Sequence, residues 1–241
     1  MTVQTNQQSN AEWPMSTTLP LELIDGHLYI ELDDGLWLVD TGAPTSFGLG
    51  GSVTVAGLPF EIDEGYFGLD PATLSGHVGV ECQGLLGADV LNRFDHVFDV
   101  ETGTLTLSTD ELELIGDLLD IEEFMEIPIV TARIGSTNCR LFFDTGAQLS
   151  YFQDDSLSAY PSAGRVTDFL PGAGQFDTET FKVPMALGSQ TFAVRCGQLP
   201  GLIGMTLMMA DVEGILGNVV MMGRKVGYFP RRGEMILGPG A

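Results

Sequence analysis

Two aspartates in this sequence are each followed by the same three residues, Thr-Gly-Ala. The first copy ends an apolar run at 36–43 and contains Asp40, and the second ends a similar run at 141–147 and contains Asp144. A serine follows each aspartate six positions later. The repeat predicts two loops of one design, each presenting a carboxylate at the end of a strand.

Two such loops have a definite chemistry if their aspartates meet. Glycine lets the backbone approach closely in a tight turn, and two adjacent carboxylates cannot both ionise at neutral pH, so they share one proton. The ionised carboxylate takes a proton from water, while the protonated one polarises a carbonyl group. The pattern predicts direct attack by water, with no metal, cofactor or nucleophilic side chain, and leaves open which aspartate holds the proton.

A second matched pair lies downstream of the two aspartates. Gly-Leu-Leu-Gly at 84–87 corresponds to Gly-Ile-Leu-Gly at 214–217, and each is followed by a strand-like segment, at 94–107 and 225–237. A single Asp-Thr-Gly is common by chance, whereas two copies with matched downstream elements indicate an internal repeat.

The elements that carry these motifs are expected to be mainly β-strands. The chain has 31 glycines and short apolar runs broken by turn residues, which favours β structure with many turns. Residues 28–38 predict a hairpin with its turn at Asp34-Gly35, and residues 127–143 predict another. Between the repeats, the acidic stretch 109–126 has helix-like spacing and is expected to link them over the surface.

The two copies differ in length in one place. Asp40 and Gly84 are 44 positions apart, against 70 for Asp144 and Gly214. Since 53–62 aligns with 183–194, the additional residues fall at about 151–181. The centre of this insertion has two strand-like arms around Pro-Gly-Ala-Gly, which is typical of a β-hairpin lid.

On these motifs the chain resembles the aspartic peptidases over most of 19–238. The Asp-Thr-Gly-Ala form resembles the retroviral-type branch, and the fusion of two copies resembles pepsin. The resemblance implies an all-β, bilobal acid-protease fold. Two retropepsin-like β-barrel lobes with short helices would be related by a pseudo-two-fold axis, with a peptide substrate in the cleft between them. The implied domains are an N-terminal tail at 1–18, a first lobe at 19–108, an acidic linker at 109–126 and a second lobe with a flap at 127–241.

The resemblance also implies residue roles. Asp40 and Asp144 would be catalytic, and Thr41 and Thr145 would link the two loops. The loops would be supported by Gly42, Ala43, Gly146 and Ala147, and the substrate-binding flap would include Phe169, Gly172, Ala173 and Gly174.

The chain departs from the pepsin pattern in two respects. The hairpin-sized insertion is in the second repeat, whereas pepsin-like enzymes carry the flap on the first lobe. The residue after Gly is alanine in both loops, so no hydroxyl there stabilises the charged carboxylate. We therefore expect a pH optimum milder than that of gastric enzymes, and a profile peaking below about pH 3 would contradict this.

Composition excludes several other functions. The net charge of −23 disfavours nucleic acids and anionic membranes as partners. The three cysteines are widely spaced, and residues 1–20 lack a signal-peptide pattern, which together favour free thiols and a cytoplasmic location. His27, His77 and His96 match no metal-ligand spacing and are interpreted as structural or surface residues.

The sequence thus predicts a monomeric aspartic endopeptidase that cuts extended peptides beside bulky apolar residues. Phe169, Leu170 and Phe176 of the expected flap are the basis for that preference. The alternative is a catalytically silent peptide-binding or scaffold protein of the same fold. A narrower possibility is a processing enzyme that cuts one partner or itself.

Overall fold

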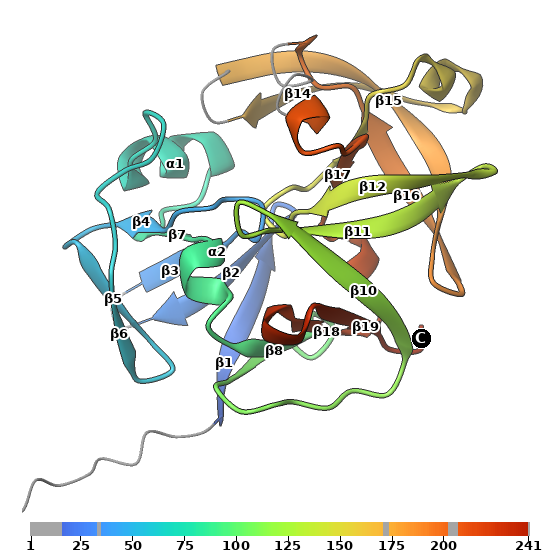
Figure 1. Ribbon diagram of the computed structural model, residues 1–241. Coiled ribbons are helices and arrows are strands. Elements are labelled where there is room, and N and C mark those ends of the chain that lie inside the picture. The colour runs from blue at the N-terminus through green and yellow to red at the C-terminus, as the bar shows by residue number, and fades with distance from the viewer. Residues whose placement is uncertain (1–15, 33–34, 171–173, 202–206, 241) are drawn as a thin grey trace, which may run out of the picture.

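The computed structural model describes residues 16–32, 35–170, 174–201 and 207–240, and most of them lie in β-strands (Figure 1). The predicted all-β class is confirmed at this level. Helical structure in the described residues is limited to short elements. The longest of these is α1 (Pro71–Val78), and Asp70 caps its first turn.

The strands fall into two sets that follow the same order. The first set is β1 (Ser16–Ile24), β2 (His27–Leu32), β3 (Gly35–Val39), β4 (Phe47–Gly48), β5 (Ser52–Val55), β6 (Leu58–Glu61), β7 (Gly84–Leu86), β8 (Asp95–Asp99) and β9 (Thr104–Ser108), with α2 (Ala88–Leu91) after β7. The second set is β10 (Asp117–Phe124), β11 (Ile127–Ile134), β12 (Thr137–Phe143), β13 (Ser150–Phe152), β14 (Ser162–Leu170), β15 (Gly174–Leu187), β16 (Gln190–Gly197), β17 (Gly214–Leu216), β18 (Lys225–Phe229) and β19 (Glu234–Leu237). The 3-10 helices η1 (Asp155–Ala159), η2 (Asn218–Met221) and η3 (Pro230–Arg232) belong to the second set.

Strand pairing repeats between the two sets. In the first, β1, β2 and β3 are consecutive antiparallel neighbours, and β3 then pairs in parallel with β7. In the second, β10, β11 and β12 do the same, and β12 pairs in parallel with β17. The hairpins expected at 28–38 and 127–143 are therefore confirmed, although Asp33 and Asp34 lie outside the described residues.

One antiparallel sheet joins the two halves of the chain. Its strands run in the order β1, β9, β8, β18, β19, β10, and the β8–β18 pair crosses from the first half to the second. The strand-like segments predicted at 94–107 and 225–237 form its four central strands. Large side chains buried on both sides of the crossing, including Phe98, Phe143 and Tyr228, belong to one shared core.

The prediction of a helix-like linker at 109–126 was wrong. Residues 117–124 form β10, which pairs with both β19 and β11, so the second half begins within the stretch assigned to the linker. Ile121, which is buried, packs into the core that both halves share. Long-range strand pairing therefore overrode the local helical spacing. At the other end, β1 begins at Ser16 rather than at residue 19, and residues 1–15 lie outside the described part.

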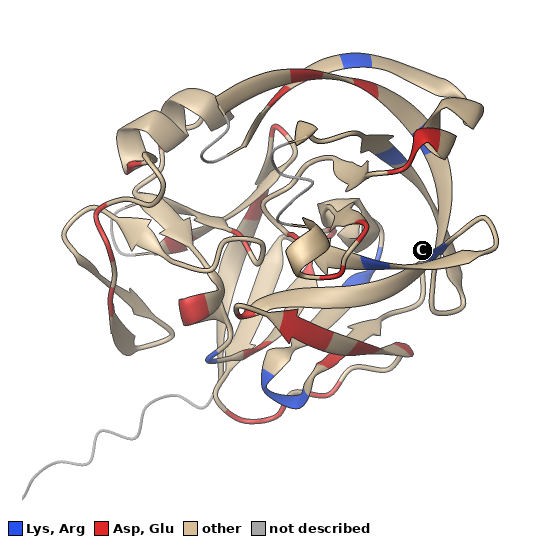
Figure 2. Ribbon diagram, turned by 45° about the horizontal axis from the view of Figure 1, so that its top comes forward, with Lys and Arg blue, Asp and Glu red and all other residues tan. Residues whose placement is uncertain are grey.

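The insertion predicted at 151–181 contains a long antiparallel hairpin. Its strands β14 and β15 pair from Ser162↔Phe181 to Leu170↔Gly174, and β15 continues into a second hairpin with β16. That second hairpin corresponds to β5–β6 in the first half. Figure 2 shows the β14–β15 hairpin arching across the molecule toward α1.

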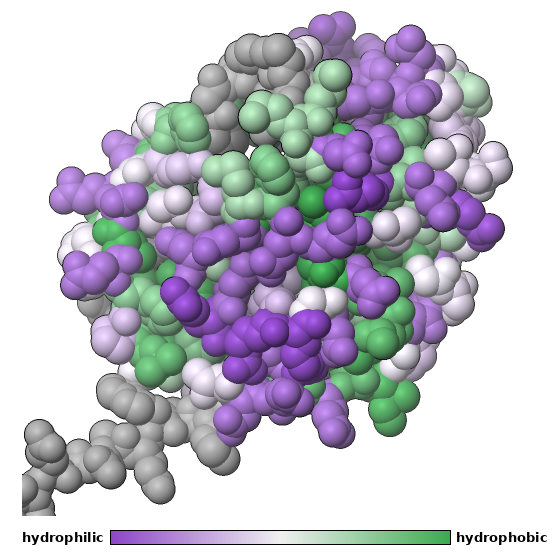
Figure 3. Space-filling view, viewed as in Figure 1, coloured by the Kyte–Doolittle hydropathy of each residue, from purple (hydrophilic) through white to green (hydrophobic). Residues whose placement is uncertain are grey.

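Acidic residues, red in Figure 2, occur in many separate elements of the ribbon, and basic residues, blue, are few. Asp95 is a buried acidic residue, and it forms ion pairs with Arg231 and Arg232 beside the central sheet. Figure 3 shows the face seen in Figure 1, where hydrophilic residues are spread widely with apolar patches among them. In the part of the chain that the structure describes, no helix has the length and apolar character needed to cross a membrane. The three cysteines are all buried and free.

Candidate active site

The two Asp-Thr-Gly-Ala loops meet between the halves of the chain. Asp40 directly follows β3 and Asp144 directly follows β12, and both side chains are half-buried. Their backbone N–H groups donate to equivalent carbonyls, that of Asp40 to Leu86 at 3.0 Å and that of Asp144 to Leu216 at 2.9 Å. Each aspartate is thus fixed at the point where its strand leaves the parallel pair with β7 or β17.

Reciprocal hydrogen bonds between the two threonines hold the loops together. The backbone N–H of Thr41 donates to Oγ1 of Thr145, and that of Thr145 donates to Oγ1 of Thr41, each at 3.0 Å. The hydroxyl of Thr41 also donates to the carbonyl of Phe143 at 2.7 Å, and that of Thr145 to the carbonyl of Val39 at 2.8 Å. Both threonines are completely buried, so these four bonds form without competition from water.

Each glycine of the motif lies against the carboxylate of the opposite loop. A Cβ atom added to Gly42 would collide with the carboxylate of Asp144, and one added to Gly146 would collide with that of Asp40. The glycines are therefore required for the close approach of the two aspartates, rather than only for the turn.

Hydrogen bonds and burial set the ionisation of the pair. Asp40 accepts from the backbone N–H groups of Gly42 at 2.9 Å and Ala43 at 3.0 Å, and Asp144 accepts from that of Ala147 at 3.0 Å. Burial, and next the negative charge of Asp144, raise the pKa of Asp40 well above its usual value. Burial also raises the pKa of Asp144, but a hydrogen bond with Asp40 acts to lower it. Because both carboxyl groups are buried and close together, they do not ionise together and hold one proton between them.

The serine that follows each aspartate supports its loop from behind. Ser46 accepts from the N–H of Gly87 at 2.8 Å through its hydroxyl oxygen, and the hydroxyl donates to Asp89 at 2.6 Å. Ser150 likewise accepts from Gly217 at 3.1 Å. Comparison of the two repeats in the sequence identified both serines and both glycines. It did not identify Asp89, which lies two residues after Gly87.

The β14–β15 hairpin reaches from the second half to the first. Phe169 on β14 stacks on His77 of α1, with ring centroids 3.6 Å apart and an interplanar angle of 16°. Next to Phe169, Asp168 accepts a hydrogen bond from the hydroxyl of Tyr151 on β13. Gly174 begins β15 with a φ of +76°, whereas Gly172 and Ala173 lie outside the described residues. Of the expected flap residues, Phe169 is thus the one with a defined contact across the halves.

Apolar side chains flank the loops on both sides. Ala43 packs against a buried cluster of the first half that includes Phe47, and Tyr66 and Phe169 pack against the same cluster. Ala147 packs against a cluster of the second half that includes Tyr151 and Phe176. Each loop therefore has an apolar cluster beside its alanine.

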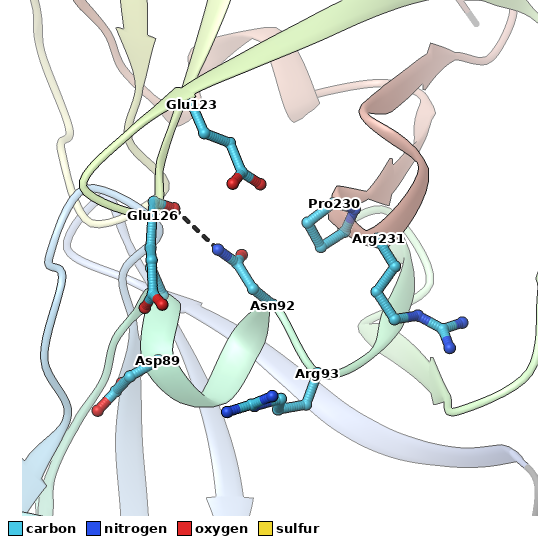
Figure 4. Close-up of a pocket in the computed structure, with 8 residues that line it drawn as sticks. Asp89, Asn92, Arg93, Glu123, Glu126, Pro230 and Arg231 are labelled. Atoms are coloured by element: carbon cyan, nitrogen blue, oxygen red, sulfur yellow. Dashed lines mark hydrogen bonds between the residues drawn. The ribbon is translucent and has the colours of Figure 1, made fainter. Parts of the chain in front are cut away.

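The pocket drawn in Figure 4 is a different site. It has a volume of about 220 Å³ and is lined by α2, the β10–β11 hairpin and η3, and neither Asp40 nor Asp144 is among its lining residues. Its exposed charges, among them Arg93, Glu123 and Glu126, have both signs and define no single ligand. Within the described ranges, no group of His, Cys, Asp and Glu side chains is arranged to hold a metal ion.

Histidine placement is the main feature that sequence reasoning missed. His96 is buried among aromatic rings, as a structural residue would be. His27 instead lies beside the second loop, with its Nδ1 2.9 Å from the carbonyl oxygen of Gly146. These two residues are 119 positions apart, and no local pattern links them.

Comparison with known proteins adds no assignment to this geometry. No protein-family model matches the chain, and a search of curated proteins gave no match either.

Proposed function

We propose that this protein is an aspartic endopeptidase that hydrolyses peptide bonds with a water molecule held between Asp40 and Asp144. In this proposal the two halves are the lobes of an acid-protease fold of retropepsin type. The observation that carries the proposal is the reciprocal pair of threonine hydrogen bonds, which holds the two loops together. This brings two half-buried carboxyl groups so close that, in addition to burial, the charge of Asp144 raises the pKa of Asp40.

The reaction follows from the ionisation of the pair. The charged carboxylate removes a proton from water as the water oxygen attacks the peptide carbonyl carbon, and the protonated carboxyl group hydrogen-bonds to the carbonyl oxygen. A tetrahedral intermediate forms with no covalent bond to the protein. Return of a proton to the peptide nitrogen then breaks the C–N bond and restores the pair for another cycle.

The substrate class follows from the surroundings of the pair. Apolar clusters flank both loops, so a peptide lying across the aspartates would place its side chains against Ala43 on one side and Ala147 on the other. We therefore expect cleavage between bulky apolar residues. The β14–β15 hairpin would cover the peptide, since Phe169 already reaches the first half, and covering excludes competing water.

The test is cleavage of an unfolded protein or a peptide library across about pH 3 to 8, a range that spans the protonation of such pairs. Asp40→Asn and Asp144→Asn should each abolish cleavage while preserving the fold. Asp120→Asn, which changes an exposed aspartate on β10, is the matched control and should cleave normally. Peptide binding without cleavage at any pH would favour the catalytically silent scaffold instead.

A further inference from the structure

His27 belongs to the first half of the chain but contacts the loop of the second. Its Nδ1 lies 2.9 Å from the carbonyl oxygen of Gly146, two residues after Asp144. A carbonyl oxygen only accepts hydrogen bonds, so Nδ1 carries the proton in this contact. The imidazole is half-buried, so water screens its charge only in part, and that charge acts on Asp144.

The turn that precedes His27 is fixed to the second half. Asp25 and Gly26 form the β1–β2 turn with φ values of +47° and +84°. The carbonyl of Gly26 accepts from Nδ2 of Asn218 at 2.8 Å, and a Cβ on Gly26 would collide with the side chain of Gln148. The position of the imidazole beside the second loop is thus set by the packing of the hairpin rather than by the histidine alone.

The equivalent turn of the second half has the same fastening but a different side chain. Met125 and Glu126 form the β10–β11 turn, also with positive φ, and the carbonyl of Glu126 accepts from Nδ2 of Asn92 at 2.8 Å (Figure 4). The pair Ile24↔His27 in the first hairpin corresponds to Phe124↔Ile127 in the second. Ile127 therefore stands where His27 stands, with neither a charge nor a hydrogen-bond donor.

This substitution makes the surroundings of the two carboxyl groups unequal. Burial is the largest effect on the pKa of both carboxyl groups, and the charge of His27 additionally acts to lower that of Asp144. The other effects on Asp40 come from Asp144 and from the backbone N–H groups of Gly42 and Ala43. Asp25 lies on the same turn as His27, and the charge of Asp144 acts on Tyr151. Burial raises the pKa of Tyr151 far out of the acid range, so it stays neutral.

We propose that His27 is a positioning residue that keeps the shared proton on Asp40, which makes Asp40 the general acid and Asp144 the base that activates water. This inference rests on the proposed function for the roles of the two groups. The unequal surroundings themselves exist whether or not the protein cleaves peptides, and they are measurable without a substrate.

The experiment follows each carboxyl group alone by ¹³C NMR of labelled aspartate. Of the two loop aspartates, the variant Asp40→Asn retains only Asp144, and the variant Asp144→Asn retains only Asp40. We expect Asp144 to titrate at lower pH than Asp40. His27→Gln retains an N–H donor but has no charge. It should raise the pH at which Asp144 titrates by about one unit, the lower end of the usual effect of an adjacent opposite charge. His77→Gln, which removes an imidazole from α1, is the control and should leave it unchanged.

A reciprocal variant tests the inference from the other side. Ile127→His, in the Asp144→Asn background, should lower the titration of Asp40 by a similar amount, because it places an imidazole at the equivalent position. Equal titration of Asp40 and Asp144, or an Asp144 titration that His27→Gln does not move, would overturn the proposal. A failed cleavage assay with these titrations intact would reject the proposed function alone.

Discussion

Replacing the hydroxyl of Thr145 tests the link between the two loops. Thr145→Val preserves the shape of the side chain but removes a buried group that donates to Val39 and accepts from Thr41. Two hydrogen bonds are lost, and a buried carbonyl and a buried N–H group lose a partner. At about 1 to 2 kcal/mol for each bond with its unpaired group, the loss is about 2 to 4 kcal/mol. For a chain of this size the melting temperature should fall by about 5 to 15 °C.

Urea unfolding of matched variants measures this loss. Thr145→Ser retains the hydroxyl and loses only a methyl group, so we expect about 1 kcal/mol. Thr18→Val removes a hydroxyl that bonds Thr106 on the exposed side of β1, and we expect less than about 0.5 kcal/mol. If Thr145→Val unfolded at the same urea concentration as Thr18→Val, the reasoning from buried reciprocal bonds would be refuted.

Three further predictions concern the loops and the ionisable groups. Gly42→Ala should abolish cleavage because its Cβ meets Asp144, whereas Gly76→Ala on α1 meets open space and should preserve both fold and cleavage, as kinetics would show. The pKa of Asp40 is higher in the folded than in the unfolded chain, so its contribution to stability is full below about pH 4 and is lost as pH rises through the folded value. Asp40→Asn should weaken this loss, and equal melting curves from acid to neutral pH would contradict it. Burial lowers the pKa of His96 from 6.5 to about 4, so its contribution is present above 6.5 and is lost as pH falls toward 4. His96→Asn should make acid unfolding less steep over that interval, and an unchanged slope would refute this.

Local patterns predicted the features that depend on short segments. The hairpins at 28–38 and 127–143 follow from alternation and turn residues, and the length difference between the copies located the β14–β15 hairpin. Helix α1 also had local signals, since Asp70-Pro71 begins it and Gly79 ends it in the left-handed conformation.

Features that depend on distant contacts were beyond the same reasoning. Residues 117–124 form a strand only because β19 and β11 lie beside them. His27 reaches Gly146 because its turn is fastened to the other half of the chain. Aligning the β1–β2 turn with the β10–β11 turn is the one sequence signal that brings His27 opposite Ile127, and it becomes meaningful once the halves are seen to pack across each other.

The kinetics of paired variants test the central claim most directly. If Asp40 and Asp144 act as one unit, then Asp40→Asn, Asp144→Asn and the double variant should all lose kcat/KM on the same peptide to the same residual level, at least about a hundredfold below the parent protein. Independent, multiplicative losses, or a single variant that retains the parent rate, would contradict the account.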